Sequence, residues 1–156
     1  MINNLYSIGY GNRKIEDFIF LLQKFDIKIL IDIRSVPFSK FRPAFNQIPF
    51  KKVLSENDIE YLFSGKELGG KPSAESVYTN GTIDYDKLRQ ASFYLEGLNE
   101  LHEILKSENN VALMCAELDF KTCHRWNLVG VDLAKKGLIM NHINKSGNIE
   151  NYSQLL

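Results

Sequence analysis

The segment Cys115–Arg125 concentrates the residue types of this sequence that are best suited to chemistry. It contains both cysteines of the chain, a histidine, an arginine and two carboxylates. Asp119 or Thr122 is placed to cap a following helix, which puts Cys123 in or near the first turn of that helix. A thiol at that place feels the helix dipole and the neighbouring arginine, and both favour the thiolate.

Groups for acid–base and nucleophilic chemistry therefore lie close together in the sequence. His124 can act as an acid or a base near neutral pH, and either cysteine is a possible nucleophile. In the structural alternative, Cys115 packs at the end of a strand and Cys123 fills a gap beneath the helix. The candidate catalytic residues are Asp32, Cys115, Glu117, Cys123 and His124.

Three narrower interpretations of this segment compete. A phosphatase with a cysteine nucleophile needs an arginine six positions after the cysteine, and Lys121 stands there, so that signature fails. Rhodanese-like sulfur transfer through a cysteine persulfide stays open as an alternative. Structural zinc spacing is absent, and adjacent Cys123 and His124 rarely point at one ion, so we expect no metal and no cofactor.

The elements that must position these groups alternate between strands and helices. Apolar and β-branched runs predict five strands, at 5–8, 27–33, 59–63, 111–115 and 138–143. Helical spacing predicts four helices, at 14–25, 51–57, 84–107 (with a break near Ser92) and 122–136. Asn12 is the expected cap of the first helix.

This alternation predicts an α/β fold: a single three-layer domain, 1–156, with a mostly parallel five-stranded sheet and helices on both faces. The core spans about 5–143, and a polar C-terminal tail follows.

Ligands of open parallel sheets bind beyond the carboxyl ends of the strands. The unusual residues of this chain lie at those ends, and the candidate substrate-binding residues are Gly9, Asn12, Arg13, Arg34, Asn46, Glu67, Gly69, Gly70 and Arg125. A dinucleotide fingerprint at Gly9-Tyr-Gly11 is incomplete, because Lys14 occupies the third glycine position; a tight turn explains the two glycines equally well. The alternative for Asp32 and Arg34 is a buried ion pair that organises the loop.

The loop 34–46 interleaves basic and aromatic residues, which suits nucleotide stacking and phosphate contact and equally suits a mobile lid. Of the other histidines, His142 at a strand end is a site candidate, and His102 is expected to be structural.

Composition excludes several classes. Lysine plus arginine equals aspartate plus glutamate at 19 each, so no bulk positive field favours non-specific nucleic-acid binding. No apolar run approaches the roughly 20 residues that span a bilayer, and the N-terminus lacks the features of a signal peptide. With only two cysteines, we expect a cytoplasmic protein without a membrane partner.

Several motifs in order resemble the domain-of-unknown-function 488 family, from about residue 5 to 143. They are Ser7-Ile-Gly-Tyr-Gly-Asn-Arg13, Ile31-Asp-Ile-Arg-Ser-Val-Pro37, Phe45-Asn46, Glu67-Leu-Gly-Gly70, Met114-Cys-Ala-Glu117 and Cys123-His-Arg125. The family usually has histidine-serine where this chain has Tyr10-Gly11. The resemblance implies a compact bacterial or archaeal α/β domain and supplies no established reaction.

We therefore expect an enzyme or binding domain for a phosphate-bearing or other anionic small molecule, such as a nucleotide or nucleic-acid component. Rhodanese-like sulfur transfer is one alternative. The other is a non-catalytic module whose loop, through Phe41 and Arg42, binds a partner or nucleic acid.

Overall fold

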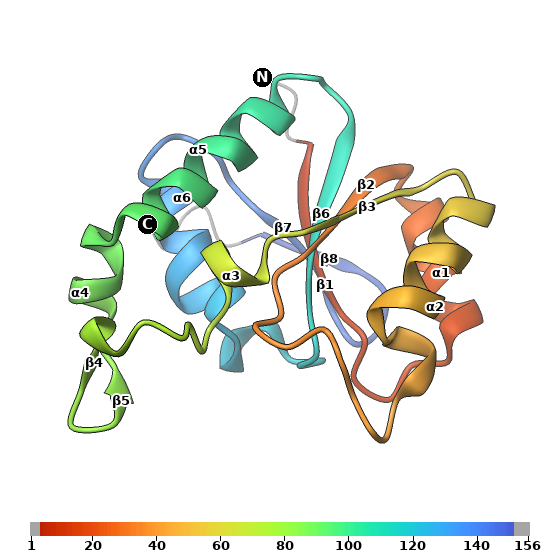
Figure 1. The fold of residues 1–156 in the computed structure, drawn as a ribbon. Coiled ribbons are helices and arrows are strands. Elements are labelled where there is room, and N and C mark those ends of the chain that lie inside the picture. Colours follow the sequence, from red (N-terminus) through yellow and green to blue (C-terminus); the bar gives the residue numbers. More distant parts are fainter. Residues whose placement is uncertain (1–3, 152–156) are drawn as a thin grey trace.

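The computed structural model describes residues 4–151, and within them six strands form one mostly parallel sheet (Figure 1). The spatial order is β3-β2-β6-β1-β7-β8. The strands are β1 (Leu5–Gly9), β2 (Ile27–Asp32), β3 (Glu60–Phe63), β6 (Asn110–Cys115), β7 (Asn141–Ile143) and β8 (Ile149–Glu150). All pairings are parallel except β7 with β8. The five predicted strands are confirmed, and β8 is an addition that pairs part of the expected polar tail with the sheet.

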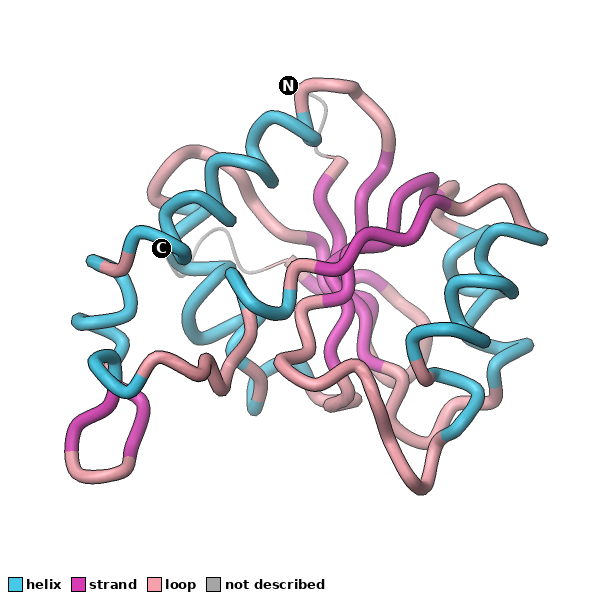
Figure 2. The backbone as a smooth tube through the Cα atoms, viewed as in Figure 1, coloured by secondary structure: helices cyan, strands magenta, loops and turns pink. Residues whose placement is uncertain are grey.

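Helices cover both faces of this sheet, as predicted (Figure 2). On one face lie α1 (Ile15–Lys24) and α2 (Gln47–Glu56). On the other lie α3 (Gly65–Leu68), α5 (Ser92–Leu105) and α6 (Val131–Ala134). Among the helices of residues 4–151, none combines the length and apolarity that crossing a membrane requires.

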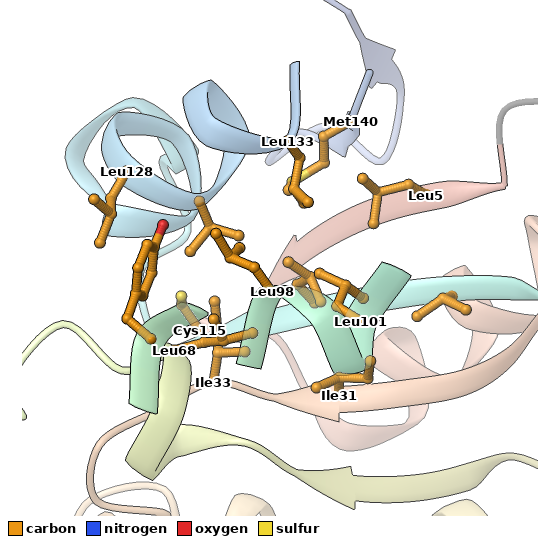
Figure 3. Close-up of a cluster of buried hydrophobic side chains, with 14 of the residues drawn as sticks. Leu5, Ile31, Ile33, Leu68, Leu98, Leu101, Cys115, Leu128, Leu133 and Met140 are labelled. Carbon is orange, nitrogen blue, oxygen red and sulfur yellow. The ribbon is translucent and has the colours of Figure 1, made fainter. Parts of the chain in front are cut away.

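Strand β6 shows why the sequences of the central strands are continuously apolar. Successive side chains point to opposite faces, so Val111, Leu113 and Cys115 join the apolar cluster beneath α5 and α6. Ala112 and Met114 join the cluster beneath α1 and α2. Figure 3 shows the first cluster, in which Cys115 lies near Ile33 and Leu68.

Several helix boundaries differ from the prediction. Helix α2 begins at Gln47 rather than at residue 51, because Pro49 lies in its first turn, where a backbone N–H has no helical partner to lose. Asn12 does not cap α1; it is exposed, and Lys14 occupies the cap position without a capping side-chain bond. The predicted helix 84–107 is divided into α4 (Tyr85–Gln90) and α5 by extended backbone at Ala91, next to the expected break.

The region predicted as a long loop after β3 contains a small hairpin, β4 (Tyr78–Thr79) with β5 (Thr82–Ile83). Its turn residues Asn80 and Gly81 both have positive φ, the pairing that a two-residue hairpin favours. The Asn-Gly pair was a usable signal in the sequence.

The predicted helix 122–136 is three pieces. A 3-10 turn, Phe120–Thr122, is followed by a wide π-helical stretch, Arg125–Gly130, and then by α6. Asp119 does cap, as one of the two expected alternatives, but it caps the short turn and not the helix.

Candidate functional site

A cleft of about 470 Å³ opens at the carboxyl edge of the sheet. Its walls come from the segments that follow β1, β2, α3 and β6, together with one residue of α4. Besides the hydroxyl groups of Ser35, Ser39 and Thr122, the lining side chains fall into three kinds. Thiol, imidazole and carboxylate groups come from the end of β6 and from the segment 116–124 that follows it, which we call the β6 loop. Cations come from Arg34 and Lys71, and apolar or aromatic groups from Tyr10, Val36, Phe38 and Tyr85.

Cys115, Cys123 and His124 form one group on this cleft, which we call the Cys–His cluster. His124 Nδ1 lies 3.7 Å from Cys123 Sγ and 4.0 Å from Cys115 Sγ. The three potential ligand atoms all lie within 4.8 Å of one another. The sequence-based expectation that the adjacent Cys123 and His124 would not point at one ion is therefore wrong, because their potential ligand atoms do lie close together.

The local chain path explains this convergence. Cys115 ends β6, and the chain then turns back through the 3-10 turn that Asp119 caps by accepting from the Lys121 backbone N–H at 3.0 Å. The backbone N–H of Cys123 donates to the Phe120 carbonyl, which closes the turn. The end of β6 and the end of the 3-10 turn thereby bring the two thiols close together.

The two thiols differ in acidity. A hydrogen bond from Cys115 lowers the pKa of Cys123, and contacts with His124 and the charge of Arg125 act in the same direction. Burial, followed by the bond and charge of Cys123, raises the pKa of Cys115. Desolvation and the nearby Cys123 sulfur raise the pKa of Glu117. Cys123 is therefore the more acidic of the two thiols.

Arg125 does not line the cleft, although the sequence suggested it as a substrate-binding residue. Its side chain is fully buried beneath the β6 loop, where Nε donates to Ser7 Oγ at 3.1 Å and Nη1 to the Glu117 carbonyl at 2.9 Å. Its backbone N–H donates to Cys123 Sγ at 3.5 Å. Arg125 holds and polarises the loop from below.

His142 belongs to the same buried network. Its Nδ1 lies 2.5 Å from Ser7 Oγ, and its ring stacks on Phe120. Burial and the positive charge of Arg125 lower the pKa of His142 to about 3. Ser7 was not among the candidate site residues, although it begins the first family motif and places a hydroxyl in a largely apolar strand.

Asp32 is also committed to structure. It is fully buried, its carboxylate accepts two bonds from the Arg34 side chain at 2.9 and 2.7 Å, and Tyr61 donates to it at 2.7 Å. Burial opposes ionisation of Arg34, but the bonds and charge of Asp32 outweigh it and raise the pKa of Arg34. This arrangement is the ion pair considered as the alternative. Arg34 itself lines the cleft, and its Nη1 has no partner among residues 4–151.

Other suggested ligands lie elsewhere. Arg13 links the end of β1 to the segment after β7 by donating to the Gly9 and Asn144 carbonyls. Asn46 accepts from the Ser39 backbone N–H, and Glu67 in α3 accepts from Ser64. Asn12 is exposed. None of these four described side chains lines the cleft.

Three of the suggested glycines serve close packing. A Cβ on Gly9 would lie 1.7 Å from the Glu117 carbonyl oxygen, and one on Gly69 would lie 2.3 Å from the Gly65 carbonyl oxygen. Gly70 does line the cleft, and a Cβ there would come within 2.9 Å of His124 Nδ1. The backbone at Gly70 is therefore part of the wall against which the imidazole rests.

The 34–46 loop is divided between the interior and the solvent. Phe45 is buried, whereas Phe38 and Phe41 are 63% and 85% exposed. Arg42 lies over the Phe45 ring and bonds the Arg13 carbonyl, so its side chain is engaged within the protein. Lys71, which the sequence analysis missed, directly follows the Gly69-Gly70 pair.

The family comparison covers most of these features. The family model described as Domain of unknown function DUF488 matches residues 14–131. The chain belongs to the DUF488 family. The match in this DUF488 protein includes the Cys–His cluster and both cleft cations, but not Ser7 or His142. No curated protein and no solved structure matches the chain.

Proposed function

We propose that this DUF488 protein is an enzyme acting on a small phosphate-bearing or otherwise anionic molecule that binds in the cleft. The observation that carries the proposal is the meeting, in one cleft, of two cations with the Cys–His cluster. Cations bind the anion, and the thiol and imidazole groups supply the reactive centre.

Arg34 is well prepared to bind an anion. Two bonds to Asp32 and one to the Phe45 carbonyl fix its guanidinium, and the ring of Tyr10 lies beneath it. Its unpartnered Nη1 is a buried donor without an acceptor, a condition that an anion in the cleft would relieve. A fixed guanidinium also loses little conformational entropy on binding.

The apolar part of the cleft supports a nucleotide as the anion. Phe38 and Val36 line the cleft and are largely exposed, at 63% and 67%. A base stacked there would cover apolar surface while its phosphate reaches Arg34 or Lys71. The free thiols are consistent with a reducing, cytoplasmic location.

Sulfur transfer is the second candidate, and the two adjacent thiols favour it. The Cys123 sulfur would attack the outer sulfur of a thiosulfate-like anion, so that a new S–S bond forms and sulfite leaves with the electron pair of the broken bond. The Arg125 backbone N–H already contacts the attacking sulfur. Mass spectrometry after incubation with thiosulfate tests this: an added sulfur must appear on the wild type and be absent from Cys123→Ser.

The anion proposal is tested by thermal shift with nucleotides, inorganic phosphate and sulfate. At least one anion should raise the melting temperature, and Lys71→Ala should reduce the shift. Lys66→Ala is the matched control, because Lys66 is equally exposed on α3 and lies outside the cleft lining. If no anion stabilises the wild type, or if both variants respond like it, the proposal is wrong.

A further inference from the structure

We propose that the Cys–His cluster binds one thiophilic metal ion, with Zn²⁺ as the best match, and that its open coordination position faces the cleft. The placement of the ion next to the anion rests on the proposed function, whereas the binding of the metal itself does not.

The separations between the donor atoms support a single ion. Metal–sulfur bonds of about 2.3 Å and metal–nitrogen bonds of about 2.0–2.1 Å in a tetrahedron imply sulfur–nitrogen separations of about 3.6 Å. The two observed separations from His124 Nδ1 are 3.7 and 4.0 Å. Both sulfur–nitrogen separations are thus within about 0.4 Å of the tetrahedral value, and the two sulfurs lie no more than 4.8 Å apart.

The chemistry of the donors selects the metal. Two thiolates and one imidazole suit zinc and other soft or borderline ions, and they disfavour Mg²⁺ and Ca²⁺, which prefer oxygen. Three protein ligands leave a fourth position open, the arrangement of catalytic rather than structural zinc. Glu117 is the only carboxylate among the described residues that line the cleft, and it lies outside the group of three donor atoms, so the fourth position stays open to a ligand from the cleft.

The surroundings resemble those of metal ligands. The Arg125 backbone N–H donates to Cys123 Sγ, and such bonds stabilise a coordinated thiolate. The buried guanidinium of Arg125 acts electrostatically on both sulfurs and offsets the negative charge that two thiolates bring. Cys115 at the end of β6 and the capped turn before Cys123 hold the ligands in place without the metal.

The orientation of His124 connects the ion to the cleft. Its Nδ1 faces the two sulfurs, and its Nε2 has no partner among residues 4–151. With Nδ1 on the metal, Nε2 carries the proton and is a buried donor that lacks an acceptor, which an anion that reaches it from the cleft would supply. The glycine at position 70 leaves the room that this ring orientation requires.

Cobalt titration tests the proposal. The full chain is reduced, stripped with a chelator and titrated anaerobically with Co²⁺ alone, without any anion. We expect thiolate-to-cobalt charge-transfer absorption and the strong visible bands of tetrahedral cobalt, saturating at one equivalent and removed by Zn²⁺. Cys115→Ser, Cys123→Ser and His124→Asn should each weaken binding at least tenfold. His102→Asn, on α5 and outside the cluster, should bind like the wild type.

The wild type decides the outcome even where a variant fails to fold. Absence of the tetrahedral spectrum in reduced wild-type protein overturns the proposal, as does its survival in folded Cys123→Ser. A thiol count under denaturing conditions detects a disulfide between the two cysteines. If the protein is then reduced and still does not bind Co²⁺, the proposal is overturned. Metal binding with no anion shift would refute only the proposed function, and an anion shift with no metal binding would refute only this inference.

Discussion

The guanidinium of Arg125 donates to the hydroxyl of Ser7, a residue 118 positions earlier in the chain, and this bond ties the β6 loop to β1. Ser7 also contacts His142 on β7, so one buried hydroxyl links three segments beneath the Cys–His cluster. The Cys–His cluster is thus supported from below by a buried polar network of other residues, namely Ser7, Arg125 and His142.

Ser7→Ala should lower the free energy of unfolding by about 3 kcal/mol, because it leaves both Arg125 Nε and His142 Nδ1 buried without this partner. Urea denaturation measures the change. Ser107→Ala, which removes an exposed hydroxyl, is the control and should stay within about 0.5 kcal/mol of the wild type. A Ser7→Ala protein as stable as the control would show that the network contributes nothing.

Asp32→Ala should lower the free energy of unfolding by about 3–5 kcal/mol, because the buried Arg34 charge would lose its carboxylate. Tyr61→Phe removes only one bond to the same carboxylate and should lower it by about 1 kcal/mol. Equal effects of the two substitutions in urea denaturation would contradict a structural role for Asp32.

The stability of the protein should fall as the pH drops below 6.5, in part through His142. The pKa of His142 is lowered to about 3 in the folded protein by burial and by Arg125, with Glu150 opposing. An unfolded histidine has a pKa of about 6.5, so between these values the unfolded chain binds a proton that the folded one does not. The contribution of neutral His142 to the free energy of unfolding is complete above pH 6.5 and is lost progressively as the pH falls towards 3.

The measurement is the free energy of unfolding at pH 7 and pH 5.5 for the wild type and for His142→Asn. The wild type should lose about 1 kcal/mol more than the variant over this interval. The same loss in both proteins would assign the pH dependence to other groups.

Gly70→Ala should weaken metal binding by about tenfold, because the added Cβ would meet His124 Nδ1 at 2.9 Å and displace the imidazole. Cobalt titration reports the affinity, and urea denaturation checks that the fold is retained. Ser73→Ala, an exposed position in the same loop, should bind cobalt like the wild type. If the cobalt affinity of Gly70→Ala were unchanged, the position of the His124 imidazole against Gly70 would not be needed for metal binding.

The sequence by itself determined the α/β class, the five parallel strands and the edge of the sheet on which the cleft opens. Local periodicity carries that information: Ile27–Asp32 and Asn110–Cys115 are apolar on both faces because helices cover both faces. Boundaries set by turn and cap chemistry were less well predicted, as the start of α2 and the β4–β5 hairpin show.

Only the tertiary structure decided what each polar residue contacts. Asp32 and Arg125 looked like groups for a ligand, but each satisfies other buried groups, since a charge removed from water needs partners wherever the fold provides them. The same long-range packing turned the side chains of the adjacent Cys123 and His124 towards one point beside Cys115. Sequence spacing placed these residues near one another, and only the path of the chain after β6 brought their reactive atoms together.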